Sequence, residues 1–171
     1  MSAAGARTRR VFISLGANLG EREVALRAAR DALAALPETS LLAASPIYET
    51  EPQELAGQPP FLNQVVCLDT ALEPADLLTR CQAIEAAAGR EPTLRFGPRS
   101  LDIDILLVEG VELDSPALTL PHPRMWRRAF VVVPLSEVWS LARGMPPVDV
   151  VALAARLAAE QGVERRPAAE E

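Results

Sequence analysis

Apolar and polar residues alternate along some parts of this chain and recur every three to four residues along others, which predicts a mixture of strands and helices. Runs rich in β-branched and other apolar residues predict four strands, at 10–16, 41–49, 61–70 and 100–108. Helical spacing predicts two helices, one that opens at Asn18 or Gly20 and stops at Pro37, and one over 73–88. The order β-α-β-β-α-β predicts an α+β fold with a ferredoxin-like core. In that fold two helices pack on one face of an antiparallel sheet, and the other face is left for a site.

The pattern after residue 108 is less regular. A strand at 111–113 fits the closing of a hairpin, and 120–123 fits a rigid loop. Residues 129–133 fit a strand by composition, but they run into 134–137, which fits the start of a helix, so both assignments stay open. We expect a single domain with a C-terminal helical extension. Its parts are a core at about 10–161, a helix at 149–161, and disordered tails at 1–9 and 162–171 of the 1–171 chain.

The charge of the chain limits what it can bind. Its 171 residues carry a net charge of −6, which argues against nucleic acid as a partner. All 17 basic residues are arginine. The lack of lysine excludes a Walker A loop and a lysine nucleophile. Any phosphate bound here therefore needs arginine, backbone N–H groups, histidine or a metal ion.

Composition also indicates a compartment. No apolar run approaches the length of a membrane span, about 20 residues, and residues 1–10 hold no apolar signal segment. Cys67 and Cys81 lack metal or redox spacing and fit buried thiols. We therefore expect a cytoplasmic protein that does not touch a membrane, and a monomer.

Two aspartates interrupt the predicted strand at 100–108, directly after a turn at Gly97 and Pro98. Because residues i and i+2 share a strand face, Asp102 and Asp104 point the same way, about 6–7 Å apart. Two carboxylates on one face repel each other, and a divalent cation removes that repulsion. Mg²⁺ is commonly held by one or two carboxylates together with phosphates and waters. The pair therefore predicts a metal site that holds a polyphosphate, or else the solvated face of an edge strand.

Several motifs resemble one enzyme family. Residues 97–104 (GPRSLDID) resemble the signature of 6-hydroxymethyl-7,8-dihydropterin pyrophosphokinase, an enzyme of folate synthesis. Further matches follow in family order: 14–20, 45–50, 61–63, Glu85 with 89–90, 120–125, and 128–130 through 134–135. The matches span the chain from about residue 11 to 138, and six of them in order make the resemblance specific.

The resemblance implies an activity and a set of roles. ATP would donate a pyrophosphoryl group to the hydroxymethyl oxygen of the pterin, and AMP would leave, with two Mg²⁺ ions assisting. The implied catalytic residues are Arg90, Arg99, Asp102 and Asp104, of which the two aspartates bind both metals. The implied ATP site adds Gln82, Glu85, Ile105, Thr119, His122 and Arg128. The implied pterin site is formed by stacking from Phe61 and Phe130, the amide of Asn63, and the backbone near Thr50.

Each residue also has a simpler explanation. Phe61 and Phe130 could belong to the core, Asn63 could satisfy a strand edge, and Glu85 could lie on the surface of its helix. His122 could hydrogen-bond its own loop. The arginines of this region could form a solvated face: Arg90, Arg95, Arg99, Arg124, Arg127 and Arg128.

Two other functions fit parts of the pattern. A different metal-dependent phosphoryl or nucleotidyl transferase would use the same aspartates without needing Phe61, Asn63 and Phe130 together. A ferredoxin-like binding or regulatory module would leave the aspartates without metal. The chain also departs from the family after Pro52, where Gln53 to Leu55 replace an early glycine. It departs again at Leu94 and Phe96, where members often carry a basic residue and a tryptophan.

Overall fold

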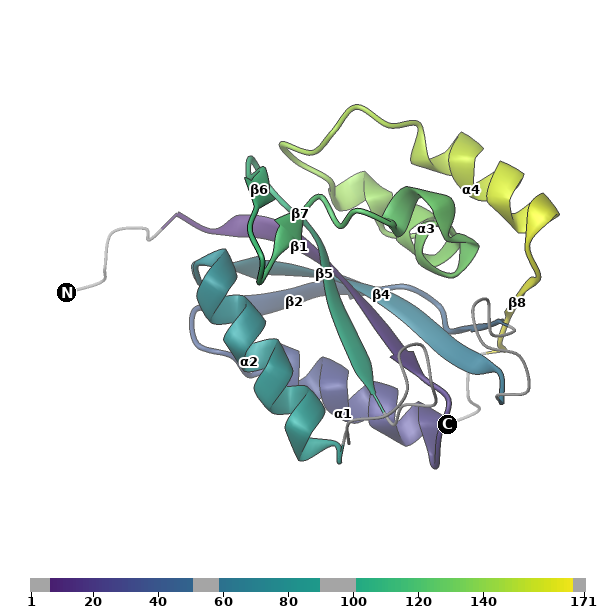
Figure 1. Cartoon of the computed structure of the whole chain (residues 1–171), viewed down its shortest axis with the longest axis horizontal. Coiled ribbons are helices and arrows are strands. Elements are labelled where there is room, and N and C mark those ends of the chain that lie inside the picture. Colours follow the sequence, from purple (N-terminus) through teal and green to yellow (C-terminus); the bar gives the residue numbers. More distant parts are fainter. Residues whose placement is uncertain (1–6, 51–58, 90–100, 168–171) are drawn as a thin grey trace.

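The computed structural model of the chain describes residues 7–50, 59–89 and 101–167. Within them an antiparallel sheet of six strands lies between two layers of helices (Figure 1). The α+β class predicted from the sequence is therefore confirmed. None of the helices in these ranges is long and apolar enough to cross a membrane.

Strand β1 (Arg9–Ala17) runs through the sheet and is antiparallel to both of its neighbours. These neighbours are β4 (Phe61–Thr70) and β5 (Asp102–Val108). On its other edge β4 pairs with β2 (Thr39–Ala44) and β3 (Tyr48–Thr50), and β3 pairs with β8 (Val163–Arg165). The path across the sheet is thus β5-β1-β4-β3-β8, with β2 beside β4.

Two predictions about these strands are wrong in detail. The strand predicted at 41–49, with a kink or an edge position at Pro46, is divided there into β2 and β3, because Pro46 has no N–H to donate and interrupts the ladder. The tails predicted to be disordered are partly ordered. Arg9 already belongs to β1, and the Thr8 hydroxyl donates to Asp69 at 3.0 Å. Strand β8 occupies 163–165, where three residues are too few to show a strand period.

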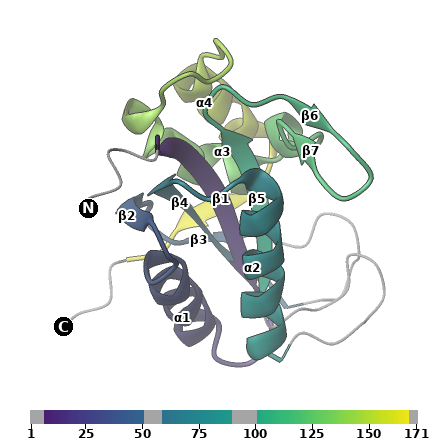
Figure 2. The ribbon, with the colours of Figure 1, turned by 90° about the vertical axis from the view of Figure 1, so that its left-hand side faces the viewer.

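The first helical layer is formed by the two predicted helices, α1 (Arg22–Ala34) and α2 (Pro74–Ala87), although α1 begins after the predicted start at Asn18 or Gly20. Their buried residues recur three to four positions apart and pack against one face of the sheet (Figure 2). This core includes Leu26, Ala29 and Leu33 of α1, Leu77 and Cys81 of α2, and Val11, Ile13, Leu15, Ile103 and Ile105 of the sheet.

The second face of the sheet is not open along its length, contrary to the prediction. Helices α3 (Ala129–Ser136) and α4 (Val150–Glu160) cover it and build a second core with Phe12, Val65 and Cys67. The open question about 129–133 is settled as helix. Its β-branched residues mimic a strand because α3 is buried between the sheet and α4, and burial outweighs their weak helix propensity.

Short elements complete the fold. Strands β6 (Leu113–Asp114) and β7 (Thr119–Leu120) form a hairpin, two residues later than predicted. Two short 3₁₀ helices flank α3: η1 (Met125–Arg127) and η2 (Trp139–Leu141). Cys67 and Cys81 are both buried thiols, as predicted. Burial raises the pKa of Cys67 to about 11 and that of Cys81 to about 12.

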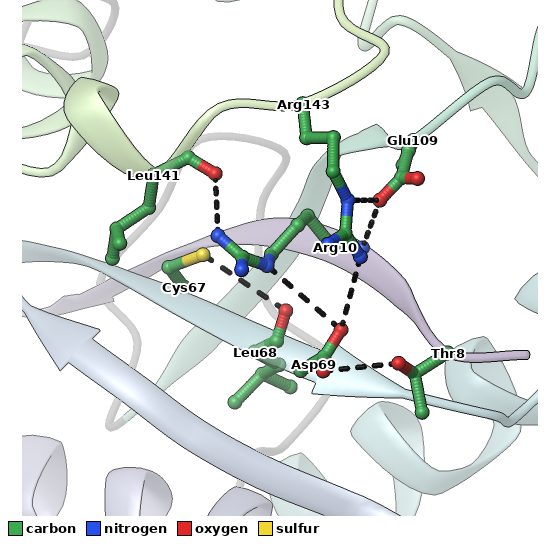
Figure 3. Close-up of polar contacts among 8 residues, drawn as sticks. All are labelled: Thr8, Arg10, Cys67, Leu68, Asp69, Glu109, Leu141 and Arg143. Carbon is green, nitrogen blue, oxygen red and sulfur yellow. Dashed lines mark hydrogen bonds and ion pairs between the residues drawn. The ribbon is translucent and has the colours of Figure 1, made fainter.

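A charged cluster of Arg10, Glu109 and Arg143 connects one end of the sheet to the segment that leads to α4 (Figure 3). The Glu109 carboxylate accepts from the backbone N–H of Arg10 at 3.0 Å and from Nε of Arg143 at 2.8 Å. The Arg10 guanidinium also donates to the carbonyl of Leu141 at 2.8 Å. These contacts lie at Val11 and Val108, the opposite end of the β1–β5 ladder from Asp102. They therefore stabilise the sheet away from the candidate site.

Candidate active site

The two aspartates of β5 face the second helical layer. Ile103 and Ile105 point into the core under α1 and α2, so the alternation of the strand turns Asp102 and Asp104 toward the side of α3. Both aspartates are half-buried. Asp102 lies opposite Gly16 on β1, and Asp104 lies opposite Ser14. The shared face predicted from the sequence is therefore confirmed.

Glu85 of α2 anchors the backbone between these aspartates. Its side-chain oxygen Oε2 accepts from the N–H of Ile103 at 3.0 Å, and the residue is only 5% exposed. The simpler explanation, a surface position on the helix, is therefore wrong. A buried carboxylate that accepts a backbone N–H fixes the strand at the point where its two aspartates leave it.

His122 lies beside β5. Its backbone N–H donates to the carbonyl of Leu106 at 2.9 Å, which ties the loop after β7 to the strand. Its Nδ1 accepts from the N–H of Arg124 at 3.3 Å, so the loop bond predicted as the simpler role exists and places the ring proton on Nε2.

The surroundings of His122 favour the uncharged form of its ring. Burial lowers the pKa of His122, the charges of Arg128 and Arg124 lower it further, and Asp102 opposes them. Because these groups act on one ring, His122, the two arginines and Asp102 belong to one electrostatic neighbourhood. A neutral imidazole there presents Nε2–H as a hydrogen-bond donor to an anion.

Arg128 and Phe130 lie together at the start of α3. The guanidinium carbon of Arg128 is 5.4 Å from the centroid of the Phe130 ring, a cation–π distance. Phe130 is half-buried and packs against the second core, so the simpler explanation accounts for part of its surface, and Arg127 is exposed. The residue predicted to contact phosphate and the one predicted to stack on the pterin are therefore neighbours.

The remaining pterin-side residues gather on β3 and β4. The amide Nδ2 of Asn63 donates to the hydroxyl of Thr50 at 2.8 Å, and both residues are buried. Phe61 lies opposite Thr50 in the ladder and is half-buried. This contact fixes the orientation of the Asn63 amide across two paired strands.

Gly16 separates the two groups of residues, and the sequence alone did not single it out. It lies opposite Asp102 on one side and Asn63 on the other. A Cβ at this position would lie 3.2 Å from Oδ1 of Asn63 and 3.9 Å from the Phe61 ring. Glycine inside a strand signals close approach by another group, which was the available clue.

Tyr48 is a second residue near the candidate site that the sequence alone did not single out. Its hydroxyl donates to Oε1 of Glu137 at 2.6 Å and so joins β3 to α3. Burial, followed by this hydrogen bond, raises the pKa of Tyr48 to about 12. The bond links the strand that carries Thr50 to the helix that carries Phe130.

The remaining predicted residues have no described contact with this group. Arg90 and Arg99 lie outside the described residues, as does the turn at 97–98. Gln82 is exposed on α2, and Thr119 is half-buried on β7. The side chain of Ile105 is 3% exposed within the first core, so a contact with ATP would have to use its backbone.

The donor set fits a magnesium ion better than a transition metal. Within the described residues no three His, Cys, Asp or Glu side chains converge on a metal position. The two aspartates supply hard oxygen ligands from one strand face. Mg²⁺ suits such a pair, because phosphates and waters complete its octahedron.

The fold and the site together are typical of a transferase that handles phosphate groups. A model of the family described as 7,8-dihydro-6-hydroxymethylpterin-pyrophosphokinase (HPPK) matches residues 12–140. A 2-amino-4-hydroxy-6-hydroxymethyldihydropteridine pyrophosphokinase of Pseudomonas aeruginosa is 48% identical over 162 residues, or 94% of this chain and 98% of that protein. One of Bacillus subtilis is 42% identical over 127 residues, or 74% of this chain and 76% of that protein.

Solved structures show the same fold. Plasmodium falciparum HPPK-DHPS matches 90% of this chain with a TM-score of 0.66 at 12% identity. This chain spans 45% of the length of that one. The chain belongs to the HPPK family. It is an ATP-dependent pyrophosphokinase of folate biosynthesis, which confirms the resemblance and removes the binding-module alternative.

Proposed function

We propose that this enzyme transfers the β- and γ-phosphoryl groups of ATP together to the hydroxymethyl oxygen of 6-hydroxymethyl-7,8-dihydropterin. The hydroxyl oxygen attacks the β-phosphorus in line, the bond from that phosphorus to the oxygen of the α-phosphate breaks, and AMP leaves. The hydroxyl proton is released. The observation that carries the proposal is that Asp102 and Asn63 flank Gly16 on adjacent strands. A carboxylate proposed for the metal side and an amide suited to the edge of a pterin therefore lie on either side of one glycine.

Asp102 and Asp104 would hold two Mg²⁺ ions, which when bound neutralise the triphosphate and polarise the attacked phosphorus. Their place on one half-buried strand face supports this role, because a bound cation would offset the repulsion between two carboxylates that share a face. Glu85 contributes by holding the N–H of Ile103 between them. Ordered carboxylates position a metal more accurately than mobile ones.

Besides the metal ions, cationic and neutral hydrogen-bond donors of the protein would bind the phosphates. Arg128 supplies a guanidinium, whose fork suits phosphate oxygens, and His122 supplies Nε2–H from an uncharged ring. An uncharged ring can donate without an additional desolvated charge. Arg90 and Arg99 are proposed as catalytic phosphate ligands on the family resemblance, as are Gln82, Glu85, Ile105 and Thr119 for the rest of ATP.

The pterin would lie between two aromatic rings and against one amide. Because Nδ2 of Asn63 is engaged by Thr50, its Oδ1 is fixed over Gly16 and would accept from the amino edge of the pterin. Phe61 and Phe130 are half-buried and belong to β4 and α3, so each presents ring surface for stacking. A different phosphoryl transferase would not need this group of residues.

Broader properties follow from the same proposal. We infer a ferredoxin-like core, supported by the strand order β5-β1-β4 followed by β2 and β3. A monomeric, cytoplasmic enzyme without nucleic acid or membrane partners fits the acidic charge and the two buried thiols. The partners that it needs are its two substrates.

The test is to mix the purified protein with ATP, Mg²⁺ and 6-hydroxymethyl-7,8-dihydropterin and to measure nucleotide products by chromatography. AMP should appear only when the pterin is present, and Asp102→Ala should abolish it. Asp114→Ala, which removes an exposed aspartate on β6, is the matched control and should retain activity. Formation of ADP, or of AMP without pterin, would contradict the proposal.

A further inference from the structure

The C-terminal strand β8 lies beyond the residues that match the family model, which end at 140. It nevertheless pairs with β3, with Tyr48 opposite Arg165 and Thr50 opposite Val163. The pairing continues one residue further, because the N–H of Arg166 donates to the carbonyl of Ile47 at 2.8 Å. Strand β3 has three residues and is held between β4 and β8. So short a strand depends on both neighbours for its position.

The Arg166 side chain joins three elements. Its Nη1 donates to Oε2 of Glu49 on β3 at 2.9 Å, and its Nη2 donates to Oε1 of Glu23 on α1 at 2.6 Å. The Arg166 side chain is 35% exposed and that of Glu49 is 30% exposed, so the pair is partly shielded from water. One planar guanidinium thus bridges two carboxylates from different elements, which an ammonium group cannot reproduce in the same geometry.

Arg22 of α1 extends this network toward β4. Its guanidinium lies 3.3 Å from the same oxygen of Glu49 and donates to the carbonyl of Pro60 at 2.8 Å. Pro60 directly precedes Phe61, and Glu49 directly precedes Thr50. The network therefore holds the residue next to each of two candidate pterin contacts.

Glu49 connects this network to the site through the pleat of β3. Tyr48 and Thr50 are buried and face the side of α3, so Glu49 between them faces α1. A shift of β3 would move the Thr50 hydroxyl, which accepts from Nδ2 of Asn63 at 2.8 Å. The orientation of the Asn63 amide would change with it.

We propose that Arg166 is a positioning residue for the pterin side of the reaction. Acting through Glu49, it holds β3 in the register at which Thr50 orients Asn63. The inference rests on the proposed function, because it assigns Asn63 to the pterin. It assigns a role in substrate recognition to a residue beyond the part of the chain that the family model matches.

The test compares Arg166→Ala with Arg165→Ala, which removes the same charge from the exposed residue next to it, the last of β8. KM for the pterin, KM for ATP and kcat are measured for each, with melting temperatures to establish that both proteins are folded. Arg166→Ala should raise KM for the pterin about fivefold and leave KM for ATP within about twofold. Arg165→Ala should leave both unchanged. Arg166→Lys should recover part of the loss, because its ammonium reaches one carboxylate.

A second set of variants tests whether Arg166 acts through Glu49. Glu49→Ala should also raise KM for the pterin, and adding Arg166→Ala to it should give less than the product of the two single effects. Independent, multiplicative effects, equal changes in both KM values, or a change in melting temperature alone would overturn the positioning role. A wild-type protein that forms no AMP with pterin would instead overturn the proposed function itself, and the inference with it.

Discussion

Removing the Glu85 side chain tests how the metal-side strand is held. In Glu85→Ala the N–H of Ile103 loses its acceptor, the Oε2 atom of Glu85 at 3.0 Å. Ile103 is only 6% exposed, so its N–H is buried. Leaving a buried donor without a partner costs about 1–3 kcal/mol. Because the acceptor here is a carboxylate, we expect the loss to be about 2 kcal/mol or more. A loss of about 2 kcal/mol corresponds to a fall in melting temperature of about 4–8 °C for a chain of this size.

The matched variant is Glu85→Gln, which keeps an oxygen acceptor of the same reach and removes the charge. It should lose only about 1 kcal/mol, since a neutral hydrogen bond remains. Urea unfolding followed by circular dichroism measures both free energies of unfolding, and KM for Mg·ATP is measured alongside. We expect Glu85→Ala to weaken Mg·ATP binding more than Glu85→Gln, because the strand between the aspartates is released. If the two variants are equally stable, Glu85 does not act through this hydrogen bond.

Three further predictions concern other contacts. Gly16→Ala should raise KM for the pterin about tenfold and change KM for ATP little, because its Cβ would lie 3.2 Å from Oδ1 of Asn63; steady-state kinetics with each substrate varied would show whether the effect is selective. Tyr48 has a pKa of about 12 when folded, above its ordinary value of 10.0, so its contribution to stability is complete below pH 10 and is lost as the pH rises from 10 to 12. Unfolding of Tyr48→Phe should show a smaller loss over that range, and an unchanged pH profile would refute the assignment. At Glu109, burial favours a higher pKa, but the N–H of Arg10 and the Arg143 guanidinium outweigh it and lower the pKa below its ordinary 4.5. Its stabilising effect is therefore present above pH 4.5 and is lost as the pH falls below it, and Glu109→Gln should flatten the acid limb of the stability profile.

The sequence was sufficient to predict an element and its buried face where the hydrophobic period and the burial agree. Alternation in β5 correctly placed Asp102 and Asp104 on one face, because Ile103 and Ile105 between and after them are core residues. Helix α3 could not be assigned in the same way. Its valines are buried on nearly all sides between the sheet and α4, so no polar face marks the helical period.

Polar contacts between residues far apart in the chain also could not be predicted from the sequence. The bond from Glu85 to Ile103, and the bridge from Arg166 to Glu49 and Glu23, join residues far apart in the chain. A lone charged residue in a sequence carries no sign of its partner. Gly16 was visible as a glycine within a strand, but its place between Asp102 and Asn63 depends on the register of three strands.

We propose above all that Asp102 and Asp104 hold the metal that binds the triphosphate. The most direct test of this proposal is calorimetric titration of the protein with a non-hydrolysable ATP analogue at increasing Mg²⁺ concentration. Wild type and Asp114→Asn should gain at least about tenfold in affinity as Mg²⁺ is added, because a metal bridge to phosphate is worth more than ~1.4 kcal/mol. Asp102→Asn and Asp104→Asn should lose that gain while their affinity without Mg²⁺ stays the same or rises. Variants that keep the full dependence on Mg²⁺ would show that the metal is held elsewhere.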